Sequence, residues 1–366
     1  RAAQQSGAST TVAGAAGDGA RAAQQGGVAA PHPADPGDAA RRVHVAARRP
    51  HVPAGAPAGN RRTAERRVRS LVAGDRGAFG MSLQVEEVRI SLPHIELAAH
   101  LFGPPDGKPV IALHGWLDNA MSFSRLAPKL AGLRIVALDF AGHGHSAHRA
   151  EGASYLLWDY ALDVLMVAEQ LGWERFSLLG HSMGAIVSVL LAGALPERIE
   201  RLALIDGLIP YTGEADKAPQ KLGEALKAQL ALRHKRKPVY AELEKAVEAR
   251  MRGVGEISRE AAELLAQRGL EPVPGGYTWR TDARLTLPSP LRLTQAHALN
   301  FVRSVECPVS LVLAEQGMLA VEPRMRALLE TLPFERHHLP GGHHLHLDDE
   351  AGAQAVARVF AAFFAR

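Results

Sequence analysis

The sequence predicts an α/β fold with a mostly parallel central sheet and helices on both faces. Two observations carry this prediction. From about residue 109 onward, short apolar runs alternate with helical patterns, which is typical of parallel strands buried on both faces. A Gly-x-Ser-x-Gly turn at 180–184 lies between one such run and the helix that follows it. The alternation stops between about 208 and 300 and resumes after it, so we expect one insertion into the sheet.

The first 80 residues differ in composition from the rest. They hold 12 Arg, no Lys, five acidic residues and a single aromatic residue, Phe79. Such a segment buries too little apolar surface to offset its ordering entropy, and it lacks the apolar stretch of a secretory signal. We therefore expect 1–80 to be a disordered low-complexity segment. We take Met81 as the natural start of translation, which would make this segment non-native.

The remaining residues carry a balanced charge. The whole chain has a net charge of +4, but 81–366 hold 30 basic and 33 acidic residues. This balance gives no reason to expect a nucleic-acid partner, and no apolar run is long enough to predict a membrane span. The single cysteine, Cys307, excludes an internal disulfide and fits a reducing, cytoplasmic location. The sequence does not indicate an oligomeric state.

The core is expected in two parts, 81–207 and 301–366. Segments 84–92 and 95–102 alternate in polarity and predict a pair of strands. Further strands are expected at 109–113, 134–138, 176–179, 202–205, 309–313 and 335–339, and helices at 155–171, 183–195, 321–331 and 350–364.

The insertion at 208–300 is charged and helical in pattern. We expect amphipathic helices at 219–235, 238–252 and 258–268, with Pro238 in a first turn and Ser258 as an N-cap. An insertion between two strands leaves the sheet at its edge, so it should form a helical cap over the strand ends.

The turn Gly180-His-Ser-Met-Gly184 carries the strongest chemical signal. A strand–turn–helix context is what a nucleophile elbow requires, so Ser182 is the candidate nucleophile. The elbow places the Met183 N–H at the start of a helix, where it can donate to a developing oxyanion. His114-Gly115-Trp116 follows an earlier apolar run, and the Trp116 N–H is the natural second donor.

The candidate base is a histidine near the C-terminus, because the chain order in this type of site is Ser, acid, His. Among the three histidines of 339–348, His343 directly follows a Gly pair, in a loop able to reach Ser182. We expect His344 and His346 to make local hydrogen bonds. A metal site at this cluster is disfavoured, since the sequence offers no obvious partner ligands.

Four motifs together resemble the α/β-hydrolase superfamily, and the resemblance covers the chain from about residue 83 to its end. They are His114-Gly-Trp-Leu-Asp-Asn119, Asp139-Phe-Ala-Gly-His-Gly-His-Ser146, the elbow, and Gly342-His-His-Leu-His-Leu-Asp348. The segments 276–282 and 314–317 look most like the serine hydrolase-like branch. The resemblance implies an α/β-hydrolase fold, in which His143 and His145 are loop residues.

The acid of the triad stays open between two residues. The family's usual Asp position aligns with Gly317, so that acid is missing. Asp206 ends the run 202–205, and some members of the superfamily carry their acid there. Glu315 lies two residues before Gly317 and has a longer side chain. We prefer Asp206.

These residues predict hydrolysis of a carboxylic ester through an acyl-enzyme on Ser182, with no cofactor and no metal. Trp279 and Tyr277, near the end of the insertion, are candidate substrate-binding residues for a small-molecule acyl substrate. Two alternatives remain: hydrolysis of an amide or a carbon–carbon bond by the same triad, and a catalytically weak binding protein that retains the fold.

Overall fold

The computed structural model describes residues 69–71, 86–320 and 323–366. Within the segment expected to be disordered, it describes only strand β1 (Arg69–Leu71), which pairs antiparallel with β2. The prediction for the rest of 1–80, and Met81 itself, lie outside the described residues.

The strands form one nine-stranded sheet in the order β1-β2-β3-β5-β4-β6-β7-β10-β11. The first three neighbouring pairs in this order are antiparallel, and every pair from β5 to β11 is parallel. The mostly parallel sheet predicted from the apolar runs is thereby confirmed. The strand bounds are β2 (Glu86–Ser91), β3 (Glu96–Phe102), β4 (Lys108–Leu113), β5 (Leu133–Leu138), β6 (Phe176–His181), β7 (Ile199–Ile205), β10 (Val309–Gln316) and β11 (Glu335–Gly342).

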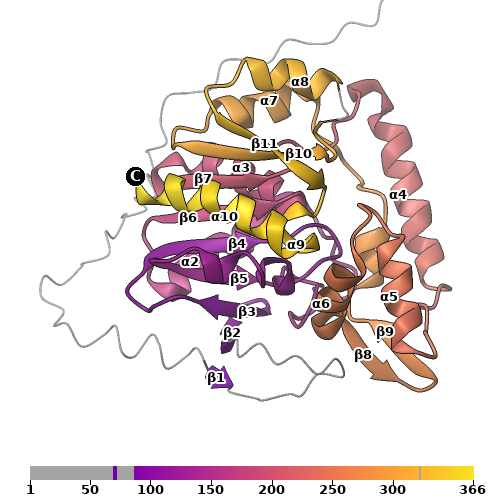
Figure 1. The fold of residues 1–366 in the computed structure, drawn as a ribbon. Coiled ribbons are helices and arrows are strands. Elements are labelled where there is room, and N and C mark those ends of the chain that lie inside the picture. The colour runs from indigo at the N-terminus through magenta and orange to yellow at the C-terminus, as the bar shows by residue number, and fades with distance from the viewer. Residues whose placement is uncertain (1–68, 72–85, 321–322) are drawn as a thin grey trace, which may run out of the picture. The chain divides into compact units, whose positions relative to one another are not determined.

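Both faces of the sheet are covered, as strand β4 illustrates. Its Ile111 and Leu113 belong to the apolar cluster that includes residues of α2 and α3, whereas Val110 and Ala112 belong to the cluster that includes residues of α10. Successive side chains of a strand point to opposite faces of the sheet. Since all four of these side chains are fully buried, both faces are covered at this strand. Figure 1 shows α10 on one face of the sheet and α2 and α3 on the other. These helices are α2 (Leu157–Leu171), α3 (Met183–Ala194) and α10 (Glu350–Ala365).

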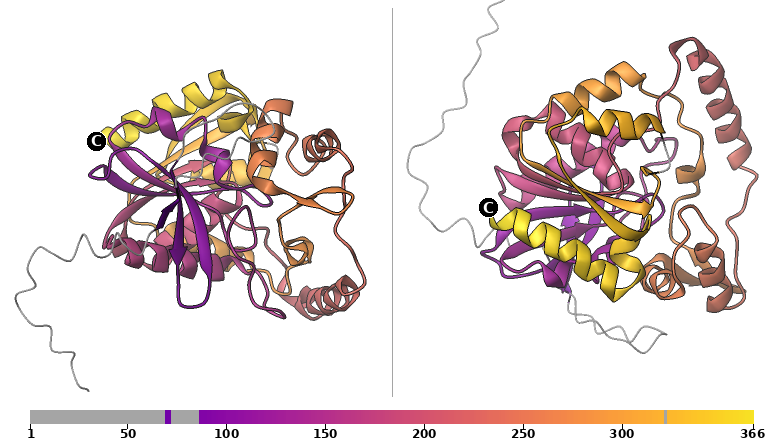
Figure 2. Two further views of the ribbon diagram at one scale, coloured as in Figure 1. Left: turned by 90° about the horizontal axis from the view of Figure 1, so that it is seen from below. Right: turned by 45° about the horizontal axis from the view of Figure 1, so that its top comes forward.

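The chain between β7 and β10 adds no strand to the large sheet. It forms α4 (Ala218–Leu232), α5 (Leu243–Met251), α6 (Arg259–Gly269), the hairpin β8 (Leu270–Val273) and β9 (Gly276–Trp279), and α7 (Gln295–Arg303). Elements α4 to β9 gather at one side of the sheet (Figures 1 and 2). Helix α7 instead packs on α3: a Cβ built on Gly193 would lie 2.4 Å from the Phe301 carbonyl oxygen. The part of the insertion that lies away from the core therefore ends before α7.

Two details of the insertion test the predicted helix starts. Ser258 caps α6 as expected, because its hydroxyl accepts a bond from the Ala261 N–H at 3.1 Å. The placement of Pro238 in a helical turn is wrong, since α5 begins only at Leu243. The Pro238 carbonyl accepts a bond from Thr278 Oγ1 at 2.8 Å, which holds this segment extended along β9. The hairpin was not predicted.

The remaining helices frame the last strand: α8 (Pro323–Glu330) precedes β11, and the short α9 (Leu345–Asp348) follows it. Among the described residues, no helix combines the length and apolarity needed to cross a membrane.

Candidate active site

Ser182 lies at the sharp turn between β6 and α3. Its φ of 51° and ψ of −115° are strained for a residue with a side chain. The turn needs its glycines, because a Cβ on Gly184 would lie 2.0 Å from the Leu113 carbonyl oxygen and one on Gly180 would lie 2.6 Å from Ala185 N. Three non-glycine residues of the described part have positive φ, namely Leu117, Ser182 and Asp206, and each lies directly after a strand or in the loop beyond it. Strain of this kind concentrates at functional sites.

Two backbone N–H groups near the elbow are free to donate. Within the described part of the chain, neither Trp116 N nor Met183 N has an acceptor. The loop that carries Trp116 is fixed by His114, whose Nδ1 donates to the Gly115 carbonyl at 2.7 Å and whose Nε2 accepts from Phe140 N at 3.0 Å. The Trp116 indole itself donates to the Leu285 carbonyl at 3.0 Å.

His343 and Asp206 are brought together from the two separate parts of the core. Asp206 Oδ2 lies 2.5 Å from His343 Nδ1, and both side chains are buried. A carboxylate only accepts, so His343 Nδ1 carries the proton of a neutral ring and Nε2 is left as its basic nitrogen. Asp206 Oδ2 also accepts the Met318 N–H at 2.7 Å, which fixes the carboxylate.

Ser182 lies next to this pair. The Ser182 N–H donates to the Ile205 carbonyl at 3.0 Å, and a Cβ on Gly207 would lie 2.8 Å from the Ser182 Cα. Asp206 is thus flanked on both sides by residues that touch the elbow. No hydrogen bond joins the Ser182 hydroxyl to His343 among the described residues. Such bonds often tighten only when substrate is bound.

The two candidate acids differ sharply in their surroundings. Glu315 is exposed, and no described contact joins it to His343. Gly317 is buried, and a Cβ built on it would lie 2.4 Å from Asp206 Oδ2. The Asp206 carboxylate therefore fills the space in which a side chain at position 317 would begin.

The two candidate substrate-binding residues lie on β9. Trp279 packs against the insertion's own apolar cluster, and a Cβ on Gly269 would lie 2.7 Å from its ring. Tyr277 pairs through its backbone with Tyr240, and both are half-buried. Their role in binding substrate stays a prediction.

His344 and His346, for which we expected local hydrogen bonds, have partners 226 and 224 residues away in the chain. His346 Nε2 lies 3.0 Å from Ser122 Oγ, and His344 Nε2 lies 3.1 Å from Asp118 Oδ2. In the loop after β5, His143 bonds the Ala141 carbonyl and His145 bonds Glu87. Burial and the neighbouring histidines hold the pKa of His181 well below its usual value.

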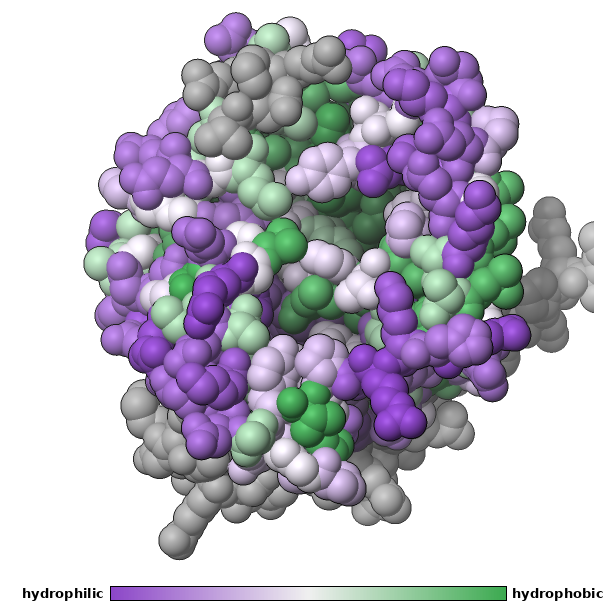
Figure 3. Space-filling view, turned by 90° about the vertical axis from the view of Figure 1, so that its right-hand side faces the viewer, coloured by the Kyte–Doolittle hydropathy of each residue, from purple (hydrophilic) through white to green (hydrophobic). Residues whose placement is uncertain are grey.

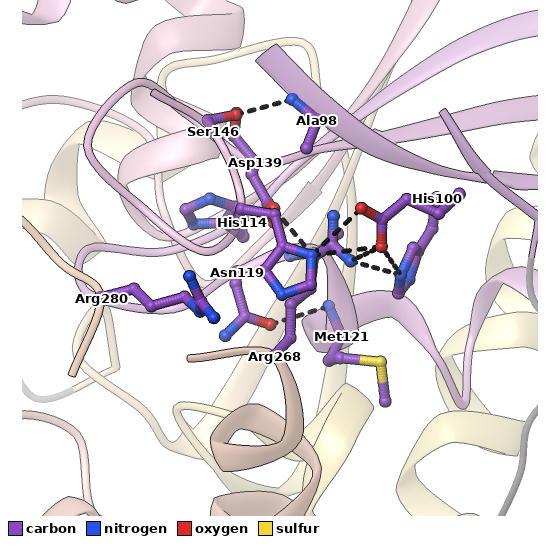
Figure 4. Close-up of polar contacts among 12 residues, drawn as sticks. Ala98, His100, His114, Asn119, Met121, Asp139, Ser146, Arg268 and Arg280 are labelled. Carbon is purple, nitrogen blue, oxygen red and sulfur yellow. Dashed lines mark hydrogen bonds and ion pairs between the residues drawn. The ribbon is translucent and has the colours of Figure 1, made fainter. Parts of the chain in front are cut away.

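Two buried ion pairs join the insertion to the core, and sequence reasoning missed both. Arg268 of α6 donates from Nε to Asp139 Oδ2 at 2.8 Å, and its Nη1 lies 2.7 Å from both Glu87 and His100 (Figure 4). Arg250 of α5 donates to Asp118 Oδ1 at 2.7 Å. One signal for these carboxylates was present in the sequence: Asp118 lies in the motif 114–119, and Asp139 begins the motif 139–146.

Basic neighbours, the two arginines among them, decide the charge state of these carboxylates. Burial alone would raise the pKa of Asp139, but Arg268, His114 and two backbone N–H groups outweigh it and lower that pKa. Burial would likewise raise the pKa of Asp118, yet His344 and Arg250 hold it well below its usual value. Both carboxylates are therefore ionised inside the protein.

The surface on the insertion side is hollowed. Figure 3 shows a depression with apolar side chains inside it and more polar side chains around it. An apolar hollow with a few polar groups is the usual form of a small-molecule site.

Comparisons with known proteins identify the same fold. The family described as alpha/beta hydrolase fold matches residues 108–251. A serine hydrolase-like protein from Danio rerio is 30% identical over 292 residues, covering 76% of this chain and 89% of the relative.

Two solved structures extend the comparison. A hypothetical protein from Pseudomonas aeruginosa PAO1 is 99% identical, covers 77% of this chain and 100% of its own, and superimposes with a TM-score of 0.76. The thioesterase domain from the curacin biosynthetic pathway is 26% identical, covers 75% of this chain and 99% of its own, and gives a TM-score of 0.66. The chain is a member of the serine hydrolase-like family and has the α/β-hydrolase fold.

Proposed function

We propose that this protein hydrolyses a carboxylic ester through an acyl-enzyme on Ser182. The observation that carries the proposal is the 2.5 Å contact between His343 Nδ1 and Asp206 Oδ2 beside the strained elbow. A carboxylate in this position selects the imidazole tautomer that accepts a serine proton and stabilises the imidazolium that results. The serine hydrolase-like relative supports the same chemistry.

The reaction follows from these positions. His343 Nε2 takes the Ser182 hydroxyl proton as Oγ attacks the ester carbonyl carbon. The negative charge that develops on the carbonyl oxygen is stabilised by the N–H groups of Trp116 and Met183, which have no described acceptor of their own. The imidazolium returns its proton to the departing alcohol. A water molecule, deprotonated by the same histidine, then releases the acid and restores Ser182.

The apolar side chains in the hollow of Figure 3 favour an apolar acyl chain. The similarity to a thioesterase domain supports an acyl substrate in general, since thioesters and oxygen esters with the same acyl group lead to the same acyl-enzyme. Trp279 and Tyr277 remain the candidates for contact with that chain.

A panel of p-nitrophenyl esters of increasing acyl length, with the matching p-nitroanilides, tests the proposal. Ser182→Ala serves as the blank. We expect hydrolysis of at least one ester at a rate well above the blank and much slower hydrolysis of the anilides. Hydrolysis of anilides at the rate of the esters would favour an amide substrate, and no hydrolysis of either would contradict the proposal.

A further inference from the structure

Three buried side chains beside the candidate active site converge on one point. Asp118, His181 and His344 offer one ligand atom each, and these atoms all lie within 4.8 Å of one another. Asp118 Oδ2 lies 3.1 Å from His344 Nε2 and 3.8 Å from His181 Nδ1. We propose that this cluster binds a divalent transition-metal ion of the Zn²⁺ type. The sequence offered no partner ligands for the C-terminal histidines, and the fold supplies them.

The hydrogen bonds of His181 leave one of its nitrogens ready to bind a cation. His181 Nε2 lies 2.9 Å from the His343 carbonyl oxygen, and a carbonyl only accepts, so Nε2 carries the proton. In the neutral ring the lone pair is then on Nδ1, which is buried without a hydrogen-bond partner in the described structure. In the interior, a nitrogen lone pair and a carboxylate oxygen that face each other repel, and a cation between the two atoms removes this repulsion. A histidine whose other nitrogen donates to a backbone carbonyl is also the usual arrangement of a metal ligand.

There is space at the point where the ligand atoms converge. A Cβ built on Gly115 would lie 3.0 Å from both Asp118 Oδ2 and His181 Nδ1, so glycine at this position keeps the region between them open. Ligands about 2.0–2.1 Å from a tetrahedral ion lie a little over 3 Å from one another. The two separations from Asp118 Oδ2, 3.1 and 3.8 Å, lie near that value, and no separation within the cluster exceeds 4.8 Å.

The donor set selects the class of ion. Two imidazole nitrogens and one carboxylate oxygen suit Zn²⁺, Co²⁺ and similar ions, whereas Mg²⁺ and Ca²⁺ prefer oxygen ligands. Three protein ligands leave a fourth position for water.

Arg250 is the group that competes with the ion. Its Nη2 donates to Asp118 Oδ1, which leaves Oδ2 for a metal, but the same nitrogen lies 3.3 Å from His344 Nε2. A bound ion would have to displace this second contact. Arg250 therefore acts as the counter-charge of the cluster when no ion is bound, and its removal should strengthen ion binding.

The position of the cluster gives the ion a consequence for the site. Asp118 is two residues from Trp116, His181 precedes Ser182, and His344 follows His343. One ion would therefore link the oxyanion loop, the elbow and the histidine loop. Only this consequence rests on the proposed function, because ion binding is measured without turnover.

Titration with Co²⁺ tests the site, because cobalt bound to nitrogen ligands at low coordination number absorbs strongly in the visible. The protein is first treated with a chelator, and Mg²⁺ serves as the ion that should not compete. We expect a saturable spectrum at one ion per chain, which Zn²⁺ abolishes. Asp118→Asn and His344→Gln should weaken binding at least tenfold, and Arg250→Gln should strengthen it.

Two matched variants keep the test sharp. His346→Gln changes a buried histidine two residues after His344 that is not a ligand, and His297→Gln changes an exposed one; both should bind Co²⁺ as the parent does. Circular dichroism and thermal melting identify any variant that fails to fold. If a ligand variant does not fold, the effect of Arg250→Gln on Co²⁺ binding decides whether the proposal holds. Absence of a saturable spectrum would overturn the proposal. So would a spectrum that survives His344→Gln, disappears with His297→Gln, or weakens with Arg250→Gln.

Discussion

The Asp206 carboxylate occupies the space directly over Gly317. A Cβ on Gly317 would lie 2.4 Å from Asp206 Oδ2 and 2.6 Å from the carboxylate carbon. The same carboxylate accepts the Met318 N–H and contacts His343 Nδ1. The Asp206 carboxylate, from the end of β7, thus lies where a side chain at position 317 would begin, so a side chain there would require this carboxylate to move.

This relationship predicts which carboxylate matters for turnover. Asp206→Asn should lower kcat by a factor on the order of 10⁴, because the imidazole loses the partner that fixes its tautomer. Glu315→Gln is the matched control, since it makes the same change on an exposed side chain. Measured on one ester, the control should keep nearly all activity. A crippled Glu315→Gln would instead assign the acid to Glu315.

The contact between Asp206 and position 317 also predicts the result of placing an aspartate at position 317. Gly317→Asp alone should reduce activity, because the new side chain collides with the Asp206 carboxylate. In combination with Asp206→Gly the space is free, and the double variant should be more active than Asp206→Gly alone. A Gly317→Asp single variant with full activity would contradict this arrangement.

The buried pair between Arg268 and Asp139 predicts an effect on stability. Arg268→Met leaves the Asp139 charge buried without its partner, so the free energy of unfolding should fall by about 3–5 kcal/mol. Arg280→Met removes a partly exposed pair with Glu271 and should cost about 1 kcal/mol or less. Urea unfolding measures both. Equal effects would show that α6 is not held to the core by this pair.

Two buried histidines predict how stability depends on pH. Burial, aided by Arg268, lowers the pKa of His100 to about 3; burial, aided by His114, does the same for His143. An unfolded histidine binds its proton near pH 6.5, so below that pH the unfolded state binds more protons than the folded state. Stability should therefore be complete above pH 6.5. It should fall toward pH 3 by about 1.4 kcal/mol per pH unit for each such histidine.

Thermal melting between pH 7 and 5 checks this. His143→Gln removes one of the buried histidines with a lowered pKa and should make the decline shallower. His297→Gln, on an exposed residue, should leave the slope unchanged. Parallel curves for the parent and His143→Gln would mean that His143 does not contribute.

The sequence predicted the central strands of the sheet well because they are buried on both faces, so their apolar runs are unambiguous. Strand β4 was expected at 109–113 and lies at Lys108–Leu113. The elbow was equally clear, since its glycines are dictated by contacts as short as 2.0 Å. His343 was singled out by the loop that carries it, and the structure brings it to Asp206.

The insertion and the ion pairs were less accessible, for physical reasons. The start of α5 and the hairpin depend on a backbone pairing between Tyr240 and Tyr277, which no local pattern encodes. Arg250 and Arg268 look like ordinary exposed charges on amphipathic helices until the fold buries them against Asp118 and Asp139. Partners 129 or more residues apart in the chain leave no signal in a single sequence.

The most direct test of the account is covalent labelling by a fluorophosphonate probe, followed by mass spectrometry of the labelled peptide. A serine at an elbow with an oriented imidazole should react quickly, and the label should lie on Ser182 alone. Ser182→Ala should show no labelling and nearly unchanged thermal melting, and Asp206→Asn should react much more slowly than Glu315→Gln. A folded protein that takes no label, or takes it on another residue, would contradict the assignment of Ser182 as the nucleophile.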